Sequence, residues 1–237
     1  MLTRILILLF VTMALAVYAK NDKKALLIID VQKDFCKSGS LEVPNADEVV
    51  PIFNNLRSSV KWDSVMLTAD WHPEKHVSFA STHEVKEFTE IVLPNGSKQM
   101  MWPDHCVQRT DGAKFHSDLV VKKSDVIVHK GTNLNVDSYS GFFDNDGESQ
   151  TELNFKLQER GIKSVYIGGL ALNVCVTYTC LDAVKLGFKT HLILDASRGL
   201  GDAQNKAAIK KLKAAGVIII NSRDIIRSFR GLKSASS

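Results

Sequence analysis

The chain has 237 residues, of which 45% are hydrophobic and 24% are charged, and its formal net charge is +4. These are ordinary values for a globular domain with a full apolar core. The Lys and Arg residues are scattered along the chain, which argues against a nucleic-acid-binding stripe. No repeat or low-complexity tract divides the chain, so one domain is expected after a short leader.

The first 19 residues have the pattern of a secretory signal peptide. Arg4 precedes an apolar segment, and small residues stand at Val17 and Ala19. The apolar segment is shorter than the roughly 20 residues that a comfortable membrane span requires. We therefore predict a signal peptide at 1–19, cleavage after Ala19, and a secreted domain at 20–237. Contact with the membrane is expected only transiently, through the signal peptide. An uncleaved anchor is the alternative.

Short apolar runs rich in Val, Ile and Leu alternate with helical stretches in the rest of the chain. Strands are expected near residues 25–30, 65–70, 125–130, 164–168, 190–194 and 216–220. Helices are expected at residues 45–60, 150–160, 173–186 and 202–215, and a glycine follows each of the last three. This alternation predicts an α/β fold: one doubly wound, Rossmann-like domain with a mainly parallel six-stranded sheet flanked by helices.

The connection from residue 72 to residue 124 is unusually long. Long loops in compact domains are usually functional or disordered. This one contains Trp102 and His105, so we expect it to contribute to a site.

Reactive side chains stand where four of the expected strands end. Asp30, Asp70 and Lys130 each end an apolar run, and Cys175 follows a fourth run after a turn of small residues. Ligands of parallel α/β sheets bind outside the carboxyl ends of the strands. We therefore expect these four side chains to converge on one edge of the sheet.

Cys175 is the candidate nucleophile. It is expected near the start of a helix, where free N–H groups and the helix dipole favour a thiolate and can hold an oxyanion. Asp30 can take the thiol proton and later return it to a leaving amine. Lys130 would hold that carboxylate, lower its pKa and favour the thiolate.

The other cysteines suggest no disulfide scaffold. Cys175 and Cys180 would share one helix, about 8–9 Å apart, which is beyond disulfide reach and opposes a thiol redox protein. The sequence leaves a Cys36–Cys106 bridge open.

Asp70 and His72, two residues apart on an extended segment, point the same way and can reach one metal ion. His105 is a candidate third ligand. Three protein ligands leave positions for water and substrate, as in catalytic sites. Imidazole and carboxylate favour Zn²⁺, with Fe²⁺ and Mn²⁺ as alternatives. Aromatic side chains near these groups are able to stack on a flat ring; they are Phe35, Trp102 and Tyr139.

Five linked motifs resemble those of nicotinamidases in the isochorismatase-like cysteine hydrolase superfamily. The matching segments are D-V-Q-K-D-F from Asp30, T-A-D-W-H-P from Thr68, W-P-D-H-C from Trp102, K-G from Lys130 with Y-S-G-F from Tyr139, and G-L-A-L-N-V-C-V from Gly169. They span residues 25–220 in order. Two features depart from the pattern: Leu172–Val174 before the cysteine, and the leader.

The resemblance implies an amidase that converts nicotinamide to nicotinic acid and ammonia through a cysteine thioester, in NAD salvage. By matching position, Asp30, Lys130 and Cys175 would form the catalytic triad. The backbone N–H groups of Ala171 and Cys175 would form the oxyanion hole, with a cis peptide before Ala171. The implied metal ligands are Asp70, His72 and His105, the ion contacts the ring nitrogen of the substrate, and the implied ring-pocket residues are Phe35, Trp102 and Tyr139.

Two alternatives remain at this point. One is another amide hydrolase of the same superfamily, and the other is a non-catalytic secreted protein that binds pyridines. The sequence also leaves the oligomeric state open, a homo-oligomer included.

Overall fold

A computed structural model of the chain describes residues 22–234. The predicted signal peptide, its cleavage site and the last three residues lie outside this range. Among the described residues, no helix combines the length and the apolar character that crossing a bilayer would need.

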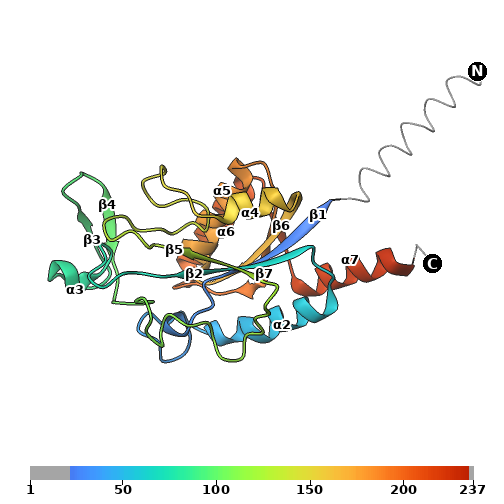
Figure 1. Cartoon of the computed structure of the whole chain (residues 1–237), viewed down its shortest axis with the longest axis horizontal. Coiled ribbons are helices and arrows are strands. Elements are labelled where there is room, and N and C mark those ends of the chain that lie inside the picture. Colours follow the sequence, from blue (N-terminus) through green and yellow to red (C-terminus); the bar gives the residue numbers. More distant parts are fainter. Residues whose placement is uncertain (1–21, 235–237) are drawn as a thin grey trace, which may run out of the picture.

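A six-stranded parallel sheet forms the centre of the domain (Figure 1). The strand order is β5-β2-β1-β6-β7-β8, and each neighbouring pair is parallel. The strands are β1 (Lys23–Ile29), β2 (Ser64–Asp70), β5 (Val126–Lys130), β6 (Ile162–Gly169), β7 (Lys189–Ser197) and β8 (Ile218–Ile220). The predicted six-stranded α/β fold is therefore confirmed.

Helices cover both faces of this sheet. α2 (Val49–Ser59) and α7 (Ser222–Ser234) lie on one side, and α4 (Leu153–Glu159), α5 (Thr177–Lys185) and α6 (Asp202–Ala214) lie on the other (Figure 1). Alternate residues of β1 point to opposite faces, so Leu26 and Ile28 pack in one apolar cluster while Leu27 and Ile29 pack in the other. Burial on both faces explains why the strands are continuously apolar.

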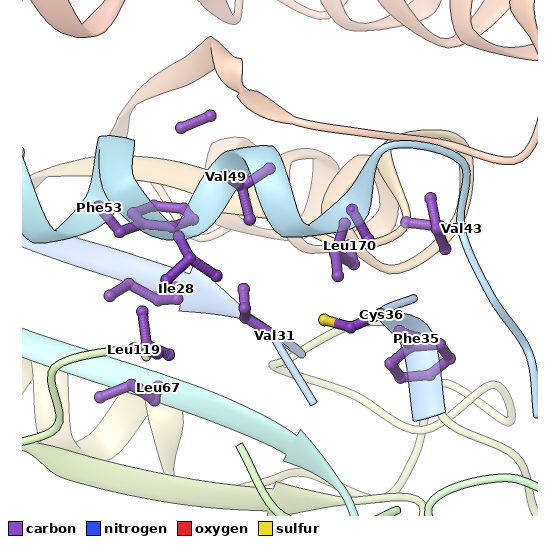
Figure 2. Close-up of a cluster of buried hydrophobic side chains, with 14 of the residues drawn as sticks. Ile28, Val31, Phe35, Cys36, Val43, Val49, Phe53, Leu67, Leu119 and Leu170 are labelled. Carbon is purple, nitrogen blue, oxygen red and sulfur yellow. The ribbon is translucent and has the colours of Figure 1, made fainter. Parts of the chain in front are cut away.

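The cluster beneath α2 extends to the functional edge of the sheet. Figure 2 shows Phe53 of α2 beside Ile28 of β1 and, further along the same layer, Val43 and Phe35. Phe35 belongs to a short 3-10 turn, Lys33–Phe35, and another, Ala46–Glu48, leads into α2. The apolar core thus continues into one wall of the candidate site.

The structure contains a short helix, a β-hairpin and a C-terminal helix that were not predicted from the sequence. Within the long connection, α3 (Ala80–His83) precedes an antiparallel hairpin of β3 (Thr89–Val92) and β4 (Lys98–Met101). The Asn95–Gly96 pair in its turn is a hairpin signal that we overlooked. The third is α7, where Ile225, Ile226 and Phe229 form an apolar stripe at helical spacing.

Candidate active site

The predicted reactive residues do converge at the carboxyl edge of the sheet. Asp30 directly follows β1, Asp70 ends β2 and Lys130 ends β5. Asp70 and Lys130 are paired residues in the register of β2 and β5. Cys175 follows β6 in a π-helical turn, Leu172–Val176, that continues into α5.

Lys130 lies at the centre of this group. Its Nζ lies 3.1 Å from Asp30 Oδ2, hydrogen-bonds Asp70 Oδ1 and lies 3.5 Å from Cys175 Sγ. It also donates to the carbonyl of Ser138 at 2.8 Å. Burial alone would lower the pKa of Lys130, but the two carboxylates outweigh it and raise that pKa well above its usual range. The ammonium is therefore permanently charged and holds the two acids together.

Asp30 has one oxygen engaged and one available. Its Oδ1 accepts a hydrogen bond from Thr68 Oγ1 at 2.6 Å. Its Oδ2 pairs with Lys130 without hydrogen-bond alignment and has no other donor within the described chain. Burial raises the pKa of Asp30 to about 6, and Lys130 offsets this only in part. Lys130 lowers this pKa, as predicted, but the complete burial of the carboxyl outweighs that effect.

Cys175 rests as a thiol. The side chain is buried, and burial raises the pKa of the thiol well above its usual value, with Lys130 lowering it only in part. The thiolate expected from the helix start is thus not the resting form. The Sγ lies within 4.8 Å of a carboxylate oxygen of Asp30. The Cys175 thiol and the free oxygen of Asp30 are therefore arranged for proton transfer when a substrate is attacked.

The turn before Cys175 carries the expected backbone feature. The Leu170–Ala171 peptide bond is cis. The carbonyl of Ala171 accepts hydrogen bonds from the amides of Val174 and Val176, at 3.0 and 3.2 Å. The amides of Ala171 and Cys175 belong to the same turn, beside the nucleophile. The first amides of a helical segment lack partners within it, so this turn is suited to hold a negative oxygen.

Asp70, His72 and His105 also come together. The Nε2 atoms of His72 and His105 lie 3.6 and 3.8 Å from Asp70 Oδ2. Each histidine has its Nδ1 against a backbone carbonyl, Gly131 at 2.9 Å and Pro103 at 2.7 Å. A carbonyl only accepts, so Nδ1 carries the proton and Nε2 has a free lone pair. These three residues fit a divalent ion.

Among the described residues, two other groups with a histidine could hold a metal ion: His72, His76 and Asp137, and Cys36, Asp47 and His116. The position of the proton on the histidine ring argues against both. Nε2 of His76 faces the carbonyl of Val136, so that atom carries the proton. Nδ1 of His116 accepts from the amide of Asp118, so its Nε2, which faces Asp47, is protonated. The remaining cluster, Asp30, Asp70 and Cys175, already surrounds an ammonium, that of Lys130.

A cavity with mostly apolar walls opens beside the nucleophile. Apolar walls with a few polar groups are typical of small-molecule sites. Seven predicted site residues line the cavity. Four are Asp70, His105, Ala171 and Cys175, and the other three are the aromatic residues Phe35, Trp102 and Tyr139. The structure adds five lining residues that we did not predict: Leu41, Val43, Asp137, Val174 and Leu200.

Leu200, one of these added lining residues, is held in place by Asn173 of the turn before Cys175. The side-chain oxygen of Asn173 accepts a hydrogen bond from the amide of Leu200 at 2.9 Å. Asn173 thereby holds the loop after β7 against the pocket. No local pattern signals this contact, because the two residues are 27 positions apart.

All four cysteines are buried and free. The Cys36–Cys106 bridge that the sequence left open is therefore not formed. Burial raises the pKa of both thiols, that of Cys36 to about 12, so neither is a reactive thiolate.

Residues 24–224 match the family model described as Isochorismatase domain. The chain belongs to the isochorismatase family. Within that family it is 41% identical over 206 residues to the nicotinamidase of Acinetobacter baylyi, covering 85% of this chain and 94% of that protein.

Two solved structures of isochorismatase-fold enzymes are similar over nearly their whole length. The Acinetobacter baumanii nicotinamidase/pyrazinamidase superposes with a TM-score of 0.81 at 41% identity, covering 86% of this chain and 99% of that one. The pyrazinamidase of Pyrococcus horikoshii, solved in complex with zinc, superposes with a TM-score of 0.69 at 33% identity, covering 84% and 99%.

Proposed function

We propose that the chain is a nicotinamidase, which hydrolyses nicotinamide to nicotinic acid and ammonia in NAD salvage. The observation that carries this proposal is the buried contact of Lys130 with Asp30, Asp70 and Cys175, beside a pocket that Asp70 and Cys175 line. The similarity to nicotinamidases over most of both chains supports the same substrate.

In the first half of the reaction Cys175 attacks the amide carbon. Asp30 accepts the thiol proton on its free Oδ2, and the new S–C bond converts the carbonyl oxygen to an oxyanion. The amides of Ala171 and Cys175 hold that charge. When the tetrahedral intermediate collapses, the C–N bond breaks, Asp30 returns its proton to nitrogen, and ammonia leaves a thioester.

In the second half, water replaces ammonia. Asp30 takes a proton from the water, whose oxygen attacks the thioester carbon. The S–C bond then breaks, the proton returns to sulfur, and nicotinic acid leaves. Lys130 keeps the Asp30 carboxylate in place and balances its charge throughout.

We further propose that Asp70, His72 and His105 hold a divalent ion, with Zn²⁺ as the identity. Two imidazoles and one carboxylate suit zinc, and the relative from Pyrococcus horikoshii was solved with zinc. When bound, the ion supplies a Lewis acid for the ring nitrogen of the substrate. The ring centroids of Phe35 and His105 lie 5.4 Å apart, so Phe35 would flank the ring of the substrate.

Ammonia release from nicotinamide tests the proposal directly, with benzamide and a carbamoyl amide as comparison substrates. We expect turnover of nicotinamide by the wild type and none by Cys175→Ala. Chelation should abolish turnover, and Zn²⁺ should restore it. Near-normal ammonia release by Cys175→Ala would contradict the mechanism, and binding of nicotinamide without hydrolysis by the wild type would favour the pyridine-binding protein.

We also propose that residues 1–19 are a cleaved secretory leader. The family match begins only at residue 24, so the leader is not needed for the domain. Mass spectrometry of the mature protein from a secreting host should give Lys20 as the first residue. A retained Met1 would contradict cleavage.

A further inference from the structure

The hydroxyl of Tyr139 is contacted by two groups that only donate hydrogen bonds. Trp102 Nε1 and Gln99 Nε2 each lie 3.3 Å from the Tyr139 oxygen. An indole N–H and an amide NH₂ carry protons and have no lone pair to offer. Neither group can accept a proton from the hydroxyl, so the proton of Tyr139 has to point elsewhere. Within residues 22–234, no group accepts a hydrogen bond from this hydroxyl.

Gln99 is held in the orientation that this arrangement needs. It lies on β4, is 5% exposed, and its Nε2 donates to Asp137 Oδ2 at 2.7 Å and to the Met100 carbonyl at 3.0 Å. Both partners are acceptors, so the NH₂ end of the side chain, and not its carbonyl, faces Tyr139. Asp137 is fixed in turn, because its Oδ1 accepts the amide of Ser138 at 2.8 Å.

The hydroxyl keeps its proton and belongs to the pocket. Burial raises the pKa of Tyr139 above its usual value, and the nearby carboxylate of Asp137 raises it further. Tyr139 lines the same cavity as Cys175 and His105. A protonated hydroxyl in this wall, with its oxygen already occupied, offers one hydrogen bond to whatever fills the cavity.

We propose that Tyr139 donates a hydrogen bond to the bound substrate and that Gln99 is a positioning residue that aims it. This rests on the proposed function, in that the ligand is a pyridine carboxamide. Such a ligand offers its amide oxygen as the acceptor, because the single lone pair of the ring nitrogen is taken by the proposed metal ion. The sequence resemblance implied Tyr139 only as a ring-pocket residue, whereas the structure assigns its hydroxyl a polar role in specificity.

Equilibrium binding on a Cys175→Ala background tests this proposal without turnover. Dissociation constants for nicotinamide and benzamide are measured by titration calorimetry with three further changes: Tyr139→Phe, Gln99→Met and both together. We expect Tyr139→Phe to weaken nicotinamide binding about five- to tenfold, the usual worth of one hydrogen bond. Gln99→Met, which keeps the side-chain length, should weaken it by a similar or smaller factor.

The double variant distinguishes positioning from a second direct contact. If Gln99 acts through Tyr139, adding Gln99→Met to Tyr139→Phe has no further effect. In the enzyme with Cys175 intact, both single variants should raise KM and leave kcat unchanged. Lys98→Met is the matched control: it lies next to Gln99 on β4, but its exposed side chain pairs with Glu90, and binding should not change.

The two ligands identify the acceptor atom. Benzamide carries the same carboxamide but lacks the ring nitrogen, so an equal loss for both ligands supports the amide oxygen as the acceptor. A loss confined to nicotinamide would mean that the ring nitrogen meets Tyr139 and not the metal ion, which would contradict the contact with the amide oxygen. Equal affinity of wild type and Tyr139→Phe for nicotinamide overturns the proposal while leaving the nicotinamidase assignment intact. Failure of the unmodified pocket to bind either ligand overturns both.

Discussion

The carboxylate of Asp70 connects Lys130 to the metal-binding histidines. One oxygen accepts from the Lys130 ammonium, and the other faces Nε2 of His72 and of His105 at 3.6 and 3.8 Å. Burial would raise the pKa of Asp70, but the charge of Lys130 opposes it, and the pKa is held below its usual range. The catalytic and metal-binding groups are thus one electrostatic unit.

Removing the cation of this unit should destabilise the fold in a pH-dependent way. Lys130→Met leaves two buried carboxylates without a counter-charge, which should cost about 3 kcal/mol of unfolding free energy at pH 8. A buried carboxyl whose pKa is raised in the folded state loses stability as the pH rises through its unfolded and then its folded pKa. Without Lys130 the pKa of Asp30 rises beyond about 6, so the loss should be smaller at pH 5.5.

Urea unfolding of wild type and Lys130→Met at both pH values checks this. Lys156→Met serves as the control, because its partner Glu152 is exposed on the helix surface and such pairs contribute little. An equal loss of stability at pH 5.5 and pH 8 would contradict the assignment of Asp30 as the group that takes up the proton.

The acid limb of activity should report the Asp30 carboxyl. Asp30 must be ionised to accept the thiol proton, and its pKa is about 6, so kcat/KM should fall tenfold per pH unit below that value. Thr68→Val removes the 2.6 Å hydrogen bond that favours the carboxylate. The pKa of Asp30 then rises, and the limb should move to higher pH by about one unit.

Rate–pH profiles of both enzymes provide the measurement. Thr190→Val is the matched control, since its buried hydroxyl donates to the Phe188 carbonyl, away from the site. If the acid limb of the profile does not move in Thr68→Val, a group other than Asp30 determines its position.

Gly131 should be required for metal binding. Its φ is +62°, and a Cβ at this position would overlap the His72 ring, whose Nδ1 is held by the Gly131 carbonyl. Gly131→Ala should therefore displace His72 and weaken metal affinity about 10–100-fold, as expected when a ligand loses its support. Zinc titration with a competing chelator measures the change.

Gly161→Ala separates this effect from backbone strain. Gly161 has nearly the same φ, +67°, but only the Lys23 side chain lies near it, at 3.9 Å. The two substitutions should cost similar conformational energy, and only Gly131→Ala should lose zinc. Equal zinc affinity in the two variants would mean that His72 tolerates the added methyl group.

A buried ion pair links α2 to the segment before β5. Arg57 Nη2 lies 2.8 Å from Asp125 Oδ2, and Nε and Nη1 of Arg57 have no hydrogen-bond partner within the described chain. Asp125→Leu alone should destabilise the protein by about 3–5 kcal/mol, because it leaves the guanidinium buried and unpaired. Arg57→Met combined with Asp125→Leu should recover more than half of that loss.

Chemical denaturation of the two single variants and the double variant completes the cycle. Additive losses would mean that Arg57 and Asp125 contribute to stability independently of each other, and the predicted recovery would then be absent.

Several features of the site could be read from the chain alone. The strands ending at Asp30, Asp70 and Lys130 were visible because apolar runs stop abruptly at a charged residue. The parallel sheet then brings those ends together, whatever the details of packing. The spacing of Asp70 and His72 on an extended segment likewise places both side chains on one side.

Other features depended on residues far apart in sequence. Gln99 reaches Asp137 across 38 positions, and Asn173 reaches Leu200 across 27. Each is an ordinary polar residue in its own segment, so no local pattern marks it. The hairpin that carries Gln99 was overlooked, although its Asn-Gly turn was there to be read.

The positions of the six strands along the chain, their parallel arrangement and the identity of the reactive groups follow from the sequence, because apolar periodicity and residue chemistry are local properties. The protonation states of Asp30 and Cys175, the proton positions on the rings of His72 and His105, and the free proton of Tyr139 were decided by the tertiary structure. Burial, counter-charges and hydrogen-bond partners set these properties, and the folded chain assembles them from segments that are not neighbours.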